Sequence, residues 1–231
     1  MARTITYAFA FQDGVTRRYE LNFDDQHRLL PRASSSPASA WTALGFQQCT
    51  NCPLKAADSP LCPVAQNIDH IVEDTKDTVS YTRAVVTVHT PERTYSAECA
   101  TQDGLRSLFG LIMACSGCPH LDWLRPLARF HLPFADPDET LFRVLGLQLV
   151  GSFLADSNST FADSIAQTDR RYEEVKTLNQ CFIKRIRIHC RADADKNALA
   201  ALDLFAQFFT LDRDDNFEML RTIFGQQKKN T

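Results

Sequence analysis

The chain has 231 residues, of which 44% are hydrophobic and 23% charged, and its formal net charge is -3 at pH 7. This is ordinary globular composition, which excludes a disordered chain, a collagen and a coiled-coil rod. No apolar run reaches the roughly 18 residues of a membrane span, and the near-neutral charge gives no strong sign of nucleic-acid binding. The unusual feature is the presence of eight cysteines.

The first hundred residues have the alternating pattern of antiparallel strands. Alternation on both sides of Asp13-Gly14 predicts a hairpin, because glycine accepts the positive φ that tight hairpin turns require. A second alternating pair covers residues 79–90 and 93–99. We therefore expect about four strands in this part of the chain.

A long segment, residues 32–63, separates the two hairpins and is rich in serine and proline in its first half. A loop of this length inside a compact domain is usually functional or mobile. Three cysteines lie in its second half. It leads into a short amphipathic helix, whose apolar residues repeat at helical spacing: Val64, Ile68, Ile71 and Val72.

From about residue 102 onward the pattern is helical. Asp136-Pro137 is a strong helix start, and the helix that follows, 141–154, is apolar nearly all round and is expected to be central and buried. Further apolar stripes cover 172–186, 199–209 and 217–224, and the basic run at 184–187 is interpreted as a solvated helix face.

These elements predict an α+β protein, with N-terminal antiparallel β-hairpins packed on a C-terminal helical bundle. Residues 1–100 form the β region with its cysteine-bearing loop, and residues 101–231 form the helical region. We expect the two regions to make one integrated domain.

The N-terminal residues 1–9 alternate and lack the apolar block of a secretory signal, so a cytoplasmic location is expected. Thiols stay reduced in that compartment, so eight cysteines are unlikely to form four disulfides. They are then buried apolar residues, reactive thiols or metal ligands.

Three of the ten prolines directly follow a cysteine, namely Cys52, Cys62 or Cys118. Proline is favoured at the first helical position, so Cys62 and Cys118 are expected at helix N-caps, where the helix dipole stabilises a thiolate. Together with the C-x-x-C pair they supply four candidate metal ligands: Cys49, Cys52, Cys62 and Cys118. Cys115, about one turn before Cys118, is the candidate substitute.

Four thiolates bind either zinc or an iron–sulfur cluster. The two C-x-x-C pairs are much further apart than the roughly 15–20 residues of a zinc ribbon. Cys-Pro dipeptides recur in bacterial ferredoxins, so the pattern favours a 4Fe–4S cluster, with Zn2+ next and a metal-free protein third. Cys99, Cys181 and Cys190 are interpreted as packing residues.

Four basic or titratable residues follow Cys118 closely: His120, Arg125, Arg129 and His131. They are candidates for a second shell around the metal or for contacts with an anionic ligand. The alternative, which their chemistry favours, is that they pair with carboxylates or carbonyls of the fold.

The segments Cys49-Thr50-Asn51-Cys52-Pro53, Cys62-Pro63 and Ser116-Gly117-Cys118-Pro119, with the later Arg129-Phe130-His131-Leu132-Pro133-Phe134, resemble an uncharacterised bacterial domain-of-unknown-function family. The resemblance covers nearly the whole chain and matches the four candidate ligands. The family usually carries a hydroxyl residue at position 115, which implies that the other four cysteines form the site.

Function is open at this point among three classes. The first is a metal-binding protein with a structural or regulatory four-cysteine site. The second is a redox enzyme or electron carrier that uses the cluster or the Cys49/Cys52 pair, and the third is a metal-free interaction module. The chain lacks the common hydrolase, nucleotide-binding and Rossmann motifs. Partner, substrate and oligomeric state are not specified by the sequence.

Overall fold

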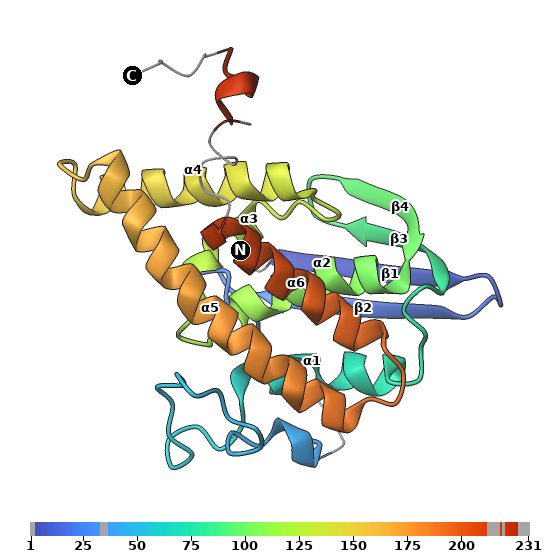
Figure 1. Cartoon of the computed structure of the whole chain (residues 1–231). Coiled ribbons are helices and arrows are strands. Elements are labelled where there is room, and N and C mark those ends of the chain that lie inside the picture. Colours follow the sequence, from blue (N-terminus) through green and yellow to red (C-terminus); the bar gives the residue numbers. More distant parts are fainter. Residues whose placement is uncertain (1–2, 33–36, 212–217, 219, 226–231) are drawn as a thin grey trace.

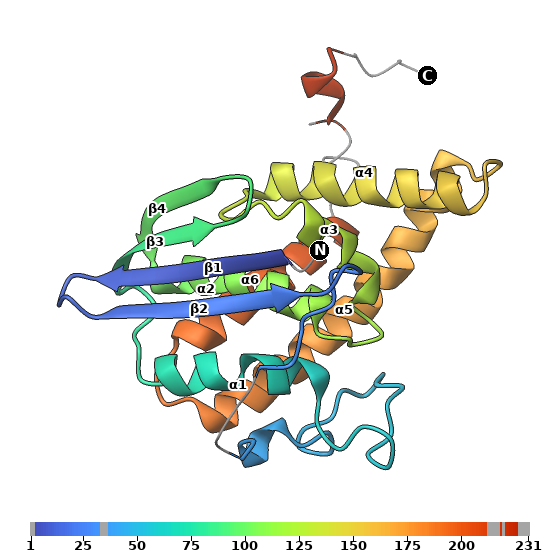
Figure 2. The ribbon, with the colours of Figure 1, turned by 180° about the vertical axis from the view of Figure 1, so that it is seen from behind.

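The computed structural model describes residues 3–32, 37–211, 218 and 220–225. A four-stranded sheet lies on one side of the molecule and the helices lie on the other (Figures 1 and 2). The strands are β1 (Arg3–Phe11), β2 (Thr16–Phe23), β3 (Arg83–His89) and β4 (Thr94–Ala100). The helices are η1 (Ala40–Thr42), α1 (Pro63–Thr75), α2 (Thr101–Cys115), η2 (Asp122–Leu124), α3 (Pro126–Arg129), α4 (Pro137–Ala155), α5 (Phe161–His189) and α6 (Ala194–Leu211).

The sheet has the order β2-β1-β3-β4, and all three pairings are antiparallel. The predicted hairpin at Asp13-Gly14 is confirmed, and Gly14 has the positive φ, 86°, that the turn requires. The second hairpin is also confirmed, although its first strand begins at Arg83. Inward-facing side chains of β1 are fully or almost fully buried and belong to the same core as the helices: Ile5, Tyr7 and Phe9. The predicted α+β class is confirmed.

Helix α2 packs directly on the sheet, with α6 and α5 beyond it (Figure 1). The contact is close because residue 104 is a glycine. A Cβ atom at this position would lie 2.6 Å from Cε1 of Phe9 and 2.9 Å from Cγ2 of Val86. Both neighbours are buried in the sheet and have little room to move.

We expect Gly104→Ala to lower the free energy of unfolding by about 1–2 kcal/mol, because overpacking outweighs the gain in helix propensity. Gly110→Ala on the same helix is the matched control, since its Cβ would meet only Leu202, at 3.6 Å. The control should be stabilised by about 0.5–1 kcal/mol. Urea unfolding measures both, and equal effects of the two substitutions would contradict the close helix–sheet contact.

Helix α4 departs from the prediction that it is central and buried. It lies along the outside of the helical layer (Figure 1), and Phe142, Phe153 and Leu154 are each more than half exposed. An apolar composition on all sides does not say which side a neighbour covers, and here α5 and α3 cover only one. Phe217 of the expected last helix and residues 33–36 of the long loop lie outside the described residues.

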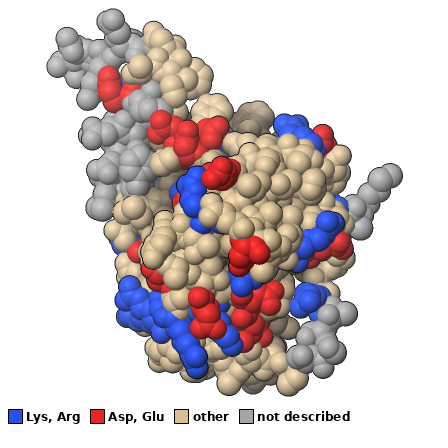
Figure 3. Space-filling model, turned by 90° about the vertical axis from the view of Figure 1, so that its right-hand side faces the viewer, with Lys and Arg blue, Asp and Glu red and all other residues tan. Residues whose placement is uncertain are grey.

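The basic run at 184–187 is only partly a solvated face. Lys184 and Arg187 are exposed, but Arg185 is buried in the protein interior. On the face shown in Figure 3, acidic and basic side chains are interspersed. Within the described part of the chain, no helix has both the length and the apolar character that crossing a membrane requires.

Candidate functional site

The second half of the long loop, residues 40–62, is folded against α5 and the start of α1 (Figure 1). Its two ends are joined by backbone hydrogen bonds, from Leu44 N to the Pro60 oxygen at 2.9 Å and from Cys62 N to the Thr42 oxygen at 2.8 Å. Asn51 reaches α5, where its side chain donates to the Glu174 carbonyl at 3.1 Å. The loop therefore has a defined position on the helical layer.

Arg185 of α5 is hydrogen-bonded to the backbone of this loop. Its side chain is buried, with 1% of the residue exposed, and it donates to three loop carbonyls. The acceptors are the carbonyl oxygens of Trp41 at 2.7 Å, Ala43 at 2.8 Å and Leu44 at 3.1 Å. Its Nε is buried without a hydrogen-bond partner, and the described residues include no carboxylate paired with it. The guanidinium is thus a buried positive charge without an ion-pair partner in the described structure.

Three of the four predicted ligands lie close enough to Arg185 to influence its pKa, and the fourth, Cys118, lies close enough to Cys49 to do the same. Cys49 lies within electrostatic reach of Cys62, Cys52 and Cys118, and Arg185 is influenced by Cys62, Cys49 and Cys52. Burial, together with the neighbouring thiols, raises the pKa of Cys49 to about 12. Three separate segments of the chain therefore bring their cysteines into one neighbourhood, where Cys62 and Cys118 are buried and Cys49 and Cys52 are partly buried.

Local structure explains how two of these cysteines are held. Cys52 closes a tight turn, with its N–H donating to the Cys49 carbonyl at 3.0 Å. Cys62 is the N-cap of α1, as predicted, with Pro63 at the first helical position. Its side chain makes no capping hydrogen bond, so the sulfur is available for another partner.

Cys118 is not at the start of an α-helix, and this prediction is wrong. One turn begins there, with Leu121 N and Asp122 N both 3.0 Å from the Cys118 oxygen. The chain then breaks into η2 and α3 because Pro126 lacks an N–H and cannot continue a helix from Asp122. Even so, backbone N–H groups of His120 and Leu121 donate to the Cys118 thiol and lower its pKa. Burial and the nearby Cys62 and Cys52 outweigh them, so the pKa is about 11.

The thiols are near one another but are not gathered around a single point. Among the described residues, no three His, Cys, Asp or Glu side chains are arranged to hold one metal ion. A tetrahedral zinc site needs each sulfur at about 2.3 Å from the metal. A single ion would therefore require the cysteine side chains to move closer together.

The second-shell candidates are dispersed. His120 lies against the cysteine turn, with its ring nitrogens 2.7 Å from the Asn51 carbonyl and 3.0 Å from Glu174 Oε2. Arg125 pairs with Asp122 at 2.9 Å, Arg129 pairs with Glu92 at 3.1 Å, and His131 shares a hydrogen bond with Tyr7. Of these four, the structure places only His120 beside the thiols.

Cys115, the candidate substitute, is influenced by Arg125, Asp122 and Asp24 instead of the other thiols. Burial raises its pKa to about 12. It lies at the end of α2, where its carbonyl accepts from Leu29 N at 3.1 Å. Cys115 is therefore a residue of the hydrophobic core.

Sequence reasoning missed two members of the site. Cys181, interpreted as a packing residue, is buried on α5 and acts on the pKa of Cys49. Arg185 lies four residues further along, one turn away on the same face of α5. This i, i+4 spacing was the available signal, but neither residue is near the other cysteines in the sequence.

Fold and site together define an α+β protein with a group of buried and partly buried thiols next to a buried arginine. The chain belongs to the family described as Domain of unknown function (DUF6901), whose model matches residues 5–225. This confirms the expected membership of a domain-of-unknown-function family. No curated protein and no solved structure matches the chain.

Proposed function

We propose that this protein binds a 4Fe–4S cluster through Cys49, Cys52, Cys62 and Cys118, with Zn2+ as the alternative occupant. The site is structural or regulatory, and the protein is proposed to act in the reducing cytoplasm, where thiols stay available to a metal. The observation that carries the proposal is the buried Arg185, which lies among these thiols without a carboxylate partner.

The charge balance supports an anionic occupant. A buried cation without a partner is costly, and hydrogen bonds to carbonyls compensate only part of that cost. Four thiolates around a metal centre give a net negative charge next to Arg185. Metal binding also deprotonates thiols that are otherwise neutral at pH 7, as the raised pKa values of Cys49 and Cys118 require.

Hydrogen bonds at Cys118 support the same assignment. Backbone N–H groups of His120 and Leu121 donate to its sulfur. N–H groups directed at cysteine sulfur are among the features that set the properties of iron–sulfur centres. A reactive Cys49/Cys52 dithiol is less well supported, because such thiols have lowered pKa values and that of Cys49 is about 12.

The sequence pattern favours the cluster over zinc, because Cys-Pro dipeptides recur in bacterial ferredoxins and the two C-x-x-C pairs lie further apart than in a zinc ribbon. In a 4Fe–4S centre the iron and sulfide atoms of the core lie between the four cysteines, so the sulfurs are further apart than around a single ion. The four thiols influence one another without forming a group that holds a single ion among the described residues, which is compatible with the larger occupant.

The test is metal analysis of protein purified without oxygen. We expect iron and acid-labile sulfide, with an absorbance band near about 400 nm. Cys52→Ser and Cys118→Ser should each lose the metal, whereas Cys99→Ser, on β4 away from the site, should keep it. Cys181→Ser, beside the site, should also keep it.

If the purified protein contains one zinc per chain and no iron, the occupant is Zn2+ and not the cluster. Parent protein that is stable and free of both metals after anaerobic purification would contradict the proposal. Full metal content in both Cys52→Ser and Cys118→Ser would show that the ligand set is wrong.

A further inference from the structure

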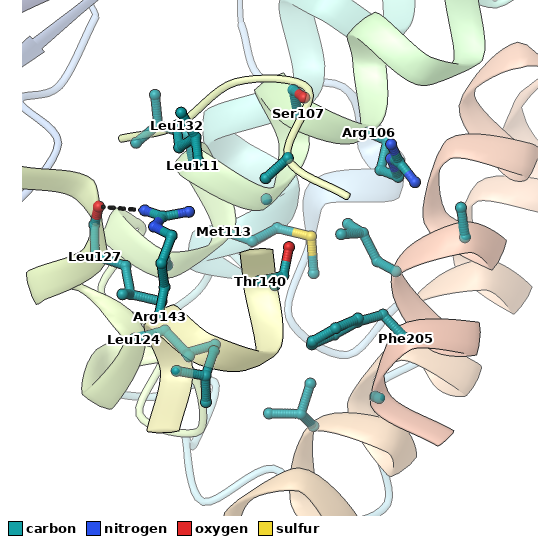
Figure 4. A pocket seen from close by; sticks show the side chains of 18 of the residues that line it. Arg106, Ser107, Leu111, Met113, Leu124, Leu127, Leu132, Thr140, Arg143 and Phe205 are labelled. Carbon is teal, nitrogen blue, oxygen red and sulfur yellow. Dashed lines mark hydrogen bonds between the residues drawn. The ribbon is translucent and has the colours of Figure 1, made fainter. Parts of the chain in front are cut away.

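A cavity of about 400 Å³ lies between α2, α3, α4, α5 and α6 (Figure 4). This volume falls within the range of small-molecule pockets, about 300–1,000 Å³. Most of its wall is apolar and includes Leu111, Met113, Leu124, Leu127 and Phe205. None of the eight cysteines is among the lining residues described, so the cavity is distinct from the thiol site.

The charged groups on the wall are mainly positive. Arg143 of α4 donates to the Phe130 carbonyl at 2.7 Å and lies 3.4 Å from the Leu127 carbonyl. No carboxylate in the described part of the chain forms an ion pair with it. Glu139, whose charge acts to raise the pKa of Arg143, accepts instead from the backbone N–H of Asp136. Burial lowers the pKa of Arg143, as expected for a cation partly withdrawn from water.

Arg106 of α2 is a second arginine on the wall, on the opposite side of the cavity from Arg143 in Figure 4, and no ion pair is recorded for it within the described ranges. The acidic residue on the wall, Asp136, is occupied as the N-cap of α4 and accepts from Glu139 N at 2.8 Å. The cavity therefore has an excess of positive charge inside an apolar wall.

Asn179 of α5 adds a polar group without a partner. The residue lines the cavity, is 2% exposed, and its Oδ1 is buried without a hydrogen-bond partner in the described structure. Leaving a buried amide oxygen without a partner is unfavourable. An ionised carboxylate only accepts hydrogen bonds, so it cannot satisfy this oxygen. The amide nitrogen of Asn179, for which no hydrogen bond is recorded among the described residues, is the group that can donate to a carboxylate.

We propose that this cavity binds an apolar carboxylate of the fatty-acid class, with its chain against the aliphatic wall and its carboxylate at Arg143. The volume suits an acyl chain, and the arginine supplies the charge-assisted hydrogen bonds that a carboxylate prefers. The amide nitrogen of Asn179 offers a further donor on the wall of the cavity. The proposal is independent of the metal site.

Calorimetric titration of the full chain with dodecanoate, below its micelle concentration, tests the proposal. We expect saturable binding with one site per chain. Dodecanol has the same chain without the charge and should bind at least about tenfold more weakly. Acetate has the charge without the chain and should not bind measurably. Absence of saturable dodecanoate binding, or equal affinity for dodecanol, would overturn the proposal.

Two variants locate the binding. Arg143→Met should weaken dodecanoate binding by about tenfold or more and leave dodecanol affinity unchanged. Arg170→Met, at an exposed arginine of α5 outside the cavity, is the matched control and should bind as the parent does. Gly110→Leu fills part of the cavity from α2 and should abolish binding while the protein stays folded, so the test does not depend on Arg143 alone. Unchanged binding in both Arg143→Met and Gly110→Leu would place the ligand elsewhere.

Discussion

Replacing Arg185 by methionine is expected to lower the free energy of unfolding by about 3 kcal/mol or more. The substitution removes the donors of three buried loop carbonyls, those of Trp41, Ala43 and Leu44. Each buried acceptor left without a donor costs about 1–3 kcal/mol, partly offset because a buried charge is also removed. Urea unfolding of the purified protein measures the change.

Arg187→Met is the matched control, because Arg187 is exposed and lies on the same helix two residues further on. An exposed substitution of this kind is worth less than about 0.5 kcal/mol. Arg185→Met should also reduce the metal content, since both the loop and the compensating charge are lost. Equal stability of the two variants would show that Arg185 does not hold the loop.

The second large expected effect is a decrease in the free energy of unfolding at acidic pH that depends on His131. His131 is buried next to Tyr7, with its Nε2 2.5 Å from the tyrosine oxygen. Burial, together with the positive charges of Arg143 and Arg3, lowers its pKa to about 3. In the unfolded chain a histidine has a pKa of about 6.5.

The sign follows from proton uptake. Below about pH 6.5 the unfolded state binds a proton on His131 that the folded state does not, so the free energy of unfolding decreases as the pH falls towards 3. Between pH 7 and 4.5 this accounts for about 2–3 kcal/mol. In His131→Gln, whose amide keeps a hydrogen bond with Tyr7, the loss over this interval should be smaller by that amount.

Urea unfolding at the two pH values measures the difference. His89→Gln, at an exposed histidine of β3, is the control and should lose stability with pH as the parent does. Other titrating groups contribute equally to the parent and the variants, so their effect cancels in the comparison. His70 is one of them, because burial lowers its pKa to about 4. A pH dependence in His131→Gln that matches the parent would contradict the buried neutral state.

Local signals in the sequence predicted much of this fold. The Asp13-Gly14 hairpin, the N-cap at Cys62 and the start of α4 at Asp136 all depend on residues that are close in the chain. Turn and capping chemistry is local, so a single sequence contains it. Each of the four candidate cysteines also belongs to a motif that can be recognised in the sequence, and the structure places Cys49 within electrostatic reach of the other three. That they bind a metal together stays a prediction.

What could not be predicted depends on contacts between distant segments. Arg185 donates to carbonyls more than 140 residues earlier in the chain, and its spacing from Cys181 does not reveal these partners. The outward position of α4 is likewise decided by which helices lie beside it. The cavity is defined by five helices together, so its volume and its arginines are properties of the packing alone.

The long separation between the loop and α5 has a consequence for synthesis on the ribosome. Cys49, Cys52 and Cys62 are made well before Cys118, and all four are made before Arg185, which fixes the loop. A nascent chain therefore carries three thiols in a segment that still lacks its contacts with α5. They are open to oxidation or premature metal capture until α5 is complete, so assembly of the site belongs to the last stage of folding.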